Sequence, residues 1–270
     1  MKRKQLFEFH DLDWFPQSWR DLMTDLMALF ESTFNPYKPV MPKITEAMAK
    51  LDCRNIVDLC SGGAAAAIRM RKYLDESGHD SIAITATDKF PNLPAFENTA
   101  RATGGRIKFV EAPVDACAVP ENLSGFRTMF TSFHHFPPGA AKKILGDAVK
   151  ENEGIGIFEY TERTWVWVVS LLLTPLVLWL AIPFIKPFKW RRIFWALMVL
   201  PVFFGAWDGV MSCLRTYSPV ELKELTKGIR AENYFWEAGR LHSFGGCYIT
   251  YLLGYPDQAP RAQARSAASA

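Results

Sequence analysis

The chain has 270 residues, of which 49% are hydrophobic and 14% aromatic, and its formal net charge at pH 7 is +3. This length suits one sizeable domain with an addition, and so small a charge gives no reason to expect a nucleic-acid-binding protein. The five cysteines lack CxxC or Cys/His spacing, so we expect a reducing compartment and no metal site.

The N-terminal segment is expected to be helical. Residues 1–14 contain no apolar run of signal-peptide length before their acids, so the sequence predicts that the N-terminal half stays in the cytoplasm. Apolar residues at helical spacing run from Phe15 to Lys50, with a break at the NPYKP turn of residues 35–39 and a new start at Ile44. Residues 1–50 are therefore expected to form a helical lead-in or lid.

Short apolar runs then alternate with helical stretches. The apolar runs are 55–60, 81–88, 106–112, 127–133 and 154–160, and the helical stretches are 64–76, 92–103 and 139–151. Strands joined by helical crossovers pair in parallel, because each crossover returns the chain along a face of the sheet. The pattern predicts an α/β fold with a doubly wound, mostly parallel sheet.

An apolar insertion is predicted for residues 165–211. The run WVWVVSLLLTPLVLWLAIPFI is long enough to cross a bilayer, but the basic linker KPFKWRR would then face outward, against the positive-inside tendency. We expect a helical hairpin that contacts the cytoplasmic face of a membrane through residues 165–207. A protein-covered cap or a dimer interface is the alternative.

The remaining chain returns to a soluble pattern. A helix is predicted near 219–229, followed by two strand-like runs within 235–256 that are joined through Gly245 and Gly246. The domain organisation is thus a core of residues 51–164 and 212–256, interrupted by the insertion, with a disordered tail at 257–270.

The stretch VDLCSGGAAAAIRM, residues 57–70, places an acid and small residues between the first strand and a helix. Small side chains let the backbone approach a ligand, and a helix N-terminus offers N–H groups to an anion. The GxGxxG fingerprint of dinucleotide enzymes fails here, because the corresponding letters are CSGGAA. The stretch favours a nucleotide-cofactor turn of another kind, with a ligand-free turn as the alternative.

Asp58, Gly62 and this strand–turn–helix setting resemble the first motif of the class I S-adenosylmethionine-dependent methyltransferases. Cys60 stands where the family usually has its first glycine, and Ala64 where it has the third. The predicted C-terminal hairpin is also typical of the family, so the resemblance covers about residues 50–163 and 216–256. It implies S-adenosyl-L-methionine as the cofactor.

The resemblance also implies a set of cofactor-binding residues. Asp88, at the end of the second apolar run, corresponds to the acid that binds both ribose hydroxyls, for which a carboxylate is well suited. Asp115 is expected at the end of the third strand and corresponds to the acidic or polar residue that meets the adenine amino group, with Ala116 supplying backbone contact. The full set is Asp58, Cys60, Ser61, Gly62, Gly63, Asp88, Lys89, Asp115, Ala116 and Ser132.

His134 and His135 follow the fourth strand, where the family borders the methyl group and the acceptor. The Asn/Asp-Pro-Pro-aromatic motif of enzymes that methylate bases or amide nitrogens is absent, and a histidine here resembles small-molecule methyltransferases. Because an imidazole can take a proton from a hydroxyl near neutral pH, both are candidate catalytic residues and oxygen is the favoured acceptor atom. Adjacent histidines are expected to point in different directions.

Further residues could shape the acceptor site. Candidates are Trp14 and Phe15 in a lid, Glu159 and Tyr160 at the end of the fifth strand, and Arg215 and Tyr217 after the insertion. Asp208 is expected to pair with Arg215 two helical turns later.

These observations predict methyl transfer to a small or lipid-like acceptor at a membrane surface. Two alternatives stay open: a non-catalytic, membrane-anchored binding module, motivated by the missing glycines, and an NAD-dependent oxidoreductase, which the failed fingerprint disfavours. A dimer formed through the hairpin also stays open.

Overall fold

A seven-stranded sheet forms the centre of the protein. The structure is a computed structural model that describes residues 1–173, 199–229 and 233–257, with residues 176, 180, 184, 188, 190 and 193. The sheet order is β3-β2-β1-β4-β5-β7-β6. The strands are β1 (Asn55–Leu59), β2 (Ala83–Ala86), β3 (Ile107–Phe109), β4 (Phe126–Phe130), β5 (Ile155–Glu159), β6 (Tyr234–His242) and β7 (Tyr248–Pro256).

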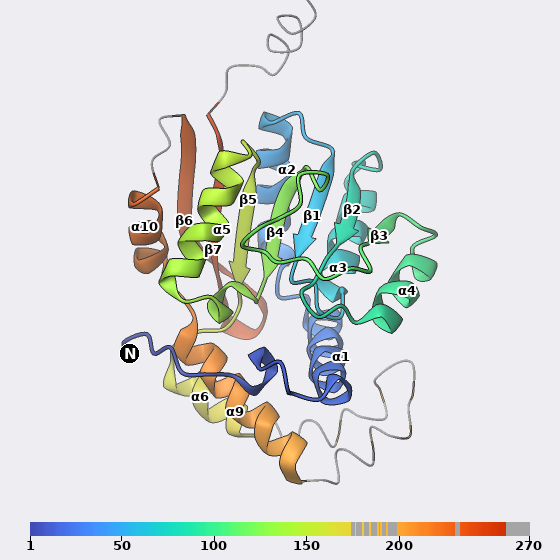
Figure 1. Ribbon diagram of the computed structural model, residues 1–270, viewed down its shortest axis with the longest axis vertical. Helices are drawn as coiled ribbons and strands as arrows, with labels where there is room; N and C mark the ends of the chain where they lie inside the picture. Colours follow the sequence, from blue (N-terminus) through green and yellow to red (C-terminus); the bar gives the residue numbers. More distant parts are fainter. Residues whose placement is uncertain are drawn as a thin grey trace, which may run out of the picture.

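The strand directions confirm the predicted fold class. The five strands from β1 to β5 pair in parallel, while β7 lies antiparallel between β5 and β6. The C-terminal hairpin is thus inserted into the sheet. Because β1 to β5 run in one direction, their carboxyl ends meet at one edge (Figure 1), called the carboxyl edge below.

Helices cover both faces of the sheet. The helices α2 (Met41–Lys50), α3 (Ala65–Glu76) and α4 (Leu93–Ala102) pack on one face, and α5 (Pro138–Lys150) and α10 (Pro219–Lys227) on the other. In β1, Ile56 faces the first layer and Val57 the second, which is the alternation of a strand buried on both sides. The helix α2 begins at Met41 rather than at Ile44, since Pro42 suits a first helical turn.

Elements that lie outside the predicted core are found at the carboxyl edge. The helix α1 (Gln17–Phe34) lies there, as do α6 (Trp165–Leu172) and α9 (Val199–Arg215) (Figure 1). The N-terminal segment, residues 1–16, includes the short 3-10 helix η1 (Phe9–Asp11) and runs along α9. Anything bound at the carboxyl edge would therefore be covered by these elements.

The two described helices of the insertion pack against each other. A Cβ added at Gly209 of α9 would lie 3.1 Å from Leu171 of α6, so the helices approach closely at this point. The helix α9 continues to Arg215, past the predicted boundary at residue 211. Within the described ranges, no helix combines the length and apolar character needed to cross a bilayer. Most of residues 174–198, and the predicted disordered tail from residue 258 on, lie outside the described residues.

Candidate functional site

Asp58 organises the loop that follows β1. Its side chain is buried, Oδ1 accepts a hydrogen bond from the Thr128 hydroxyl at 2.7 Å, and Oδ2 accepts one from the Ser61 hydroxyl at 2.7 Å. Burial raises the pKa of Asp58 to about 7, although both hydrogen bonds act in the opposite direction. The buried carboxyl group therefore holds the loop after β1 in its conformation.

The loop has an unusual backbone at the positions where the resemblance expects glycine. Cys60, Gly62 and Ala64 have φ angles of +56°, +52° and +58°. An L-residue in this left-handed region costs about 1–2 kcal/mol, and such strain is concentrated at functional sites. Cys60 and Ala64 thus adopt the left-handed backbone conformation that glycine favours, although neither residue is glycine.

Asp88 lies two residues beyond β2 and contacts this loop. Its Oδ2 accepts a hydrogen bond from the Gly62 N–H at 2.8 Å, and its Oδ1 accepts one from the Phe90 N–H at 2.8 Å. The neighbouring Lys89 is exposed, with its ammonium 5.5 Å from the centre of the Phe90 ring. The structure therefore brings the predicted ribose-binding carboxylate beside the predicted glycine loop.

Asp115 does not lie at a strand end. The strand β3 stops at Phe109, and Pro113 cannot donate to a continuing ladder. Asp115 is exposed on the following loop, where its Oδ1 accepts the Cys117 N–H at 2.8 Å, while Ala116 is buried. A hydrogen bond of 2.9 Å from the Val114 N–H to the Asp88 carbonyl returns this loop to the end of β2.

The helix α1 covers the loop after β1. A Cβ added at Gly63 would lie 3.0 Å from Ala28 Cβ and 3.1 Å from the Thr24 carbonyl oxygen. The Thr24 hydroxyl also accepts a hydrogen bond of 3.3 Å from the Asn92 amide. The lead-in thus acts as a cover, but through the middle of α1 and not through the predicted lid residues.

The two predicted lid residues have different surroundings. Phe15 is buried in an aromatic cluster with Phe9, Trp19 and Phe204. Trp14 is 65% exposed. The ring centre of Trp14 lies 6.3 Å from those of Phe9 and Phe15.

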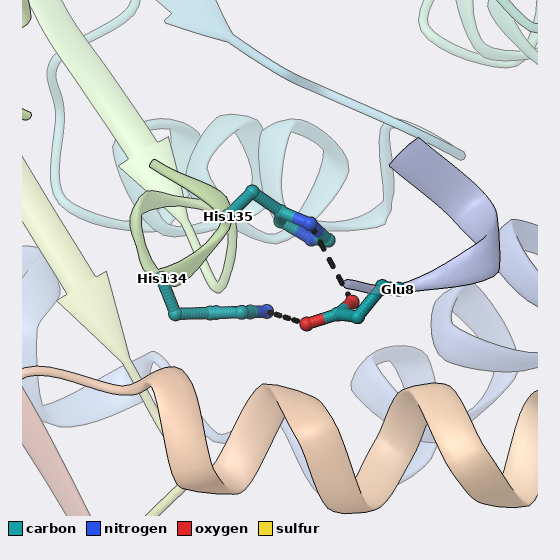
Figure 2. A group of neighbouring side chains, drawn as sticks. All are labelled: Glu8, His134 and His135. Carbon is teal, nitrogen blue, oxygen red and sulfur yellow. Dashed lines mark ion pairs between the residues drawn. The ribbon is translucent and has the colours of Figure 1, made fainter. Parts of the chain in front are cut away.

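His134 and His135 lie in a single 3-10 turn, η3 (Phe133–His135), directly after β4. The expectation that they point in different directions is wrong, because this tight turn places both rings on one side with their centres 4.3 Å apart (Figure 2). His134 is buried, and its Nδ1 lies 2.8 Å from Oε2 of Glu159 at the end of β5. Burial would raise the pKa of Glu159, but His134 outweighs it and the pKa is lowered.

The N-terminal segment closes over these rings. Glu8 is buried, with Oε1 3.9 Å from His134 Nε2 and Oε2 3.5 Å from His135 Nδ1 (Figure 2). Asp11 Oδ1 lies 2.7 Å from His135 Nδ1. Burial lowers the pKa of His135, but Glu8 and Asp11 outweigh it and raise the pKa to about 9. A protonated His135 cannot accept a proton, so the base role stays a prediction that suits His134 better.

Arg215 joins the same cluster. Its Nη1 lies 3.0 Å from Glu8 Oε1 and 2.7 Å from Asp11 Oδ2, and its Nε donates to the His134 carbonyl at 3.2 Å. The expected pair of Asp208 with Arg215 is wrong. Asp208 instead accepts the Phe9 and His10 N–H groups at 2.7 and 3.0 Å. The N-terminal segment runs along α9, so Asp208 and Arg215 both have their partners in that segment.

The remaining predicted residues, Tyr160, Tyr217 and Ser132, are not among the ion-paired groups of this cluster. Tyr160 is buried beside Phe30, Tyr37 and Trp167. Tyr217 donates to the Phe136 carbonyl at 2.8 Å. Ser132 is buried, and its hydroxyl has no hydrogen-bond partner within the described ranges.

A second buried network lies under α1. The Tyr37 hydroxyl is 2.8 Å from Glu31 Oε1 and 2.9 Å from Thr131 Oγ1, and Thr131 has a φ of +43°. Burial raises the pKa of Glu31 to about 8. Glu31 is therefore a mostly uncharged carboxylic acid at neutral pH.

Sequence reasoning missed Glu8, Asp11, Thr128 and Glu31. The FEFHDLDWFP segment mixes acids with aromatic residues, but nothing in it indicates which partners those acids meet. Thr128 reads as an ordinary strand residue, and Glu31 as a polar position of an amphipathic helix.

No family model and no curated protein matches the sequence, but solved structures do. The plantazolicin methyltransferase BpumL, in complex with SAH, is 11% identical with a TM-score of 0.54, covering 89% of this chain and 96% of that one. A candidate O-methyltransferase from Nostoc punctiforme is 12% identical with a TM-score of 0.50, covering 87% and 59%.

A third structure is that of NcsB1, an O-methyltransferase of neocarzinostatin biosynthesis, in complex with S-adenosylmethionine and 2-hydroxy-5-methyl naphthoic acid. It is 12% identical with a TM-score of 0.50, covering 86% of this chain and 56% of that one. The chain thus spans less than two thirds of the Nostoc and NcsB1 proteins. Together with the sheet order and the antiparallel β7, these likenesses show that the chain has the fold of the class I S-adenosylmethionine-dependent methyltransferases.

Proposed function

We propose that the protein transfers a methyl group from S-adenosyl-L-methionine to a small or lipid-like acceptor. The observation that carries the proposal is the contact between Asp88 and Gly62, which sets a carboxylate beside a left-handed loop at the carboxyl edge. In doubly wound sheets, ligands bind at this edge. BpumL and NcsB1, which share the fold, are described in complex with SAH and S-adenosylmethionine.

The residues of the loop fit such a cofactor. Each oxygen of Asp88 accepts one backbone N–H and has further lone pairs for the ribose hydroxyls. Gly62 and Gly63 would bring the backbone close to the ligand, Asp58 and Ser61 would hold the loop, and the Asp115 loop would meet the adenine. Because Ala28 packs on Gly63, we infer that α1 shifts when the cofactor enters.

The cofactor supplies the reactive methyl group, and the chain aligns the acceptor. We infer that the acceptor binds near His134, His135 and Glu159, because η3 follows β4, Glu159 ends β5, and both strands end at the same carboxyl edge as β1 (Figure 1). Oxygen is the favoured acceptor atom. In the NcsB1 complex the second ligand is a hydroxylated naphthoic acid, which is a ligand of the proposed size.

The surface of α6 supports attachment to a membrane. None of its residues is buried, and Trp165 and Val166 are 72% and 76% exposed. A helix that is apolar all round needs an apolar partner. We infer that it lies at the cytoplasmic face of a membrane, close to the site, so that a lipid-like acceptor could reach the carboxyl edge. A dimer would use the same surface.

A non-catalytic binding module is the second candidate. It is favoured by the strained Cys60 and Ala64 and by the close packing of α1 on Gly63. Such a protein would bind S-adenosylhomocysteine as well as an enzyme does, but it would transfer no methyl group.

Calorimetric titration of the full chain with S-adenosylmethionine, S-adenosylhomocysteine and NAD tests the proposal first. We expect both sulfur compounds to bind and NAD not to bind. Incubation with methyl-labelled S-adenosylmethionine, lipid extracts and phenolic acids then tests transfer. Failure to bind either sulfur compound at millimolar concentration would overturn the proposal, and binding without transfer to any acceptor would favour the binding module.

A further inference from the structure

We propose that Glu8, His134 and His135 bind a divalent transition-metal ion, with Zn²⁺ as the first choice. One ligand atom from each side chain lies within 4.8 Å of the other two, and Figure 2 shows the carboxylate facing both rings. Because the cysteines lack Cys/His metal-binding spacing, the sequence predicts no metal site. The zinc site goes beyond the proposed methyl transfer and does not depend on it.

The imidazole of His134 and the carboxylate of Glu8 face each other without a hydrogen bond. Nε2 and Oε1 face each other at 3.9 Å, which is too far for a hydrogen bond. Both atoms are buried; His134 Nε2 has no hydrogen-bond partner in the described part of the chain, whereas Glu8 Oε1 faces Arg215 Nη1 at 3.0 Å as an ion pair. Leaving buried polar atoms unpaired is costly. Two ligands of a tetrahedral zinc ion lie about 3.3 Å apart, so a small movement would let one ion satisfy both atoms.

His134 and Glu8 are each held in place by a further contact. His134 Nδ1 contacts the Glu159 carboxylate at 2.8 Å, which leaves the lone pair of Nε2 directed at Glu8. Glu8 Oε2 accepts the Ser212 hydroxyl at 3.2 Å. His135 Nδ1 faces both Asp11 Oδ1, at 2.7 Å, and Glu8 Oε2, at 3.5 Å, so Asp11 competes for that nitrogen and does not orient it from behind. Metal-binding histidines and carboxylates are typically oriented by such outer contacts.

The two rings lie among more carboxylates than guanidinium groups. Four carboxylates, Glu8, Asp11, Glu159 and Asp208, surround the rings together with two guanidinium groups, Arg3 and Arg215. The carboxylates outnumber the guanidinium groups by two, which favours a cation between the rings, and a metal ion bound there would displace the proton of His135. Arg215 Nη1 lies 3.0 Å from Glu8 Oε1, but a carboxylate oxygen has two lone pairs and can face both cations.

The donor set selects the metal. Two imidazoles and one carboxylate are suited to Zn²⁺ and its neighbours, whereas Mg²⁺ and Ca²⁺ prefer oxygen ligands alone. A bound ion would join residue 8 to residues 134 and 135. It would thereby fasten the N-terminal segment across the carboxyl edge.

The test is calorimetric titration of the chelator-treated full chain with ZnCl₂, in the absence of S-adenosylmethionine. We expect one Zn²⁺ per chain and no comparable binding of Mg²⁺. Glu8→Gln and His135→Asn should each lower the affinity for Zn²⁺ at least about tenfold, and Glu159→Gln, which acts through His134, about 10- to 100-fold. His79→Asn, which changes an exposed histidine outside the cluster, should leave the affinity unchanged.

Absence of stoichiometric Zn²⁺ binding, or equal binding by the Glu8 and His135 variants, would overturn the proposal. If those variants do not fold, X-ray absorption of the zinc-loaded original chain decides. Imidazole nitrogen with carboxylate oxygen supports the site, and thiolate sulfur or no imidazole overturns it. Zn²⁺ binding by a chain that binds neither sulfur compound would overturn the proposed function alone.

Discussion

The Gly62 N–H donates a hydrogen bond of 2.8 Å to the carboxylate of Asp88, and this contact ties the loop after β1 to the end of β2. The sequence predicts both residues as cofactor ligands on separate grounds, Gly62 from a motif and Asp88 from its spacing. Their contact sets a negatively charged acceptor at the mouth of a left-handed loop, where a diol could replace or share the backbone donor.

Asp88→Asn is expected to weaken binding of S-adenosylhomocysteine by about 1–3 kcal/mol, since the amide loses the charge and one acceptor. Titration calorimetry of the folded variant measures the effect. Asp80→Asn, at an exposed position away from the loop, is the matched control. Equal affinities of the Asp88 variant and the original chain would remove Asp88 from the site.

Gly63→Ala is expected to destabilise the chain by about 1–3 kcal/mol, because the new methyl group would press on Ala28 and on the Thr24 backbone. Adding Ala28→Gly should recover part of this loss, so the two changes should couple. Urea denaturation gives the free energies of unfolding. Gly139→Ala meets no atom within 4 Å and should cost nothing. A Gly63 variant as stable as this control would contradict the close packing of α1.

Glu31 should make the stability of the protein depend on pH. Its pKa is about 8 in the folded state, raised mainly by burial from a reference value of 4.5. The stabilising contribution of the protonated form is therefore complete below pH 4.5 and is lost as pH rises to 8, since only the unfolded chain ionises in this range. The free energy of unfolding should fall between these pH values.

Glu31→Gln removes this titration, so the variant should lose less stability than the original chain between pH 5 and pH 8. Urea denaturation at both pH values measures the difference. Glu46→Gln, at an exposed position of α2, should follow the original chain. Parallel pH profiles for the Glu31 variant and the original chain would show that Glu31 ionises normally.

The exposed face of α6 should decide membrane binding. The combined changes Trp165→Ser, Val169→Ser and Leu172→Ser remove three exposed apolar side chains, and we expect them to reduce flotation with phosphatidylcholine–phosphatidylglycerol vesicles several-fold. The control carries Val220→Ser and Phe235→Ser, which change exposed apolar residues elsewhere. Unchanged flotation of the α6 variant, or a monomeric state reached only by that variant, would favour a dimer surface instead.

Local patterns were sufficient to predict the sheet and its helices. Runs such as NIVDLC are apolar enough to be buried on both faces, and the helical crossovers between them force parallel pairing. The same patterns located Asp58 and Asp88, because Asp58 lies in β1 next to its last residue and Asp88 lies two residues beyond β2. The position of Asp115 could not be predicted in this way, because the loop after β3 is long enough to place Asp115 away from the strand end.

The sequence by itself determined the fold class, the alternation of strands and helices, and the places of Asp58, Gly62 and Asp88 near the ends of β1 and β2, because these depend on periodicity and on neighbours along the chain. Only the tertiary structure decided the surroundings of His134 and His135. Glu8, Asp11 and Arg215 reach them from the N-terminal segment and from α9. Contacts between residues so far apart depend on how whole elements pack, and a side chain gives no local signal of the partner that burial will bring to it.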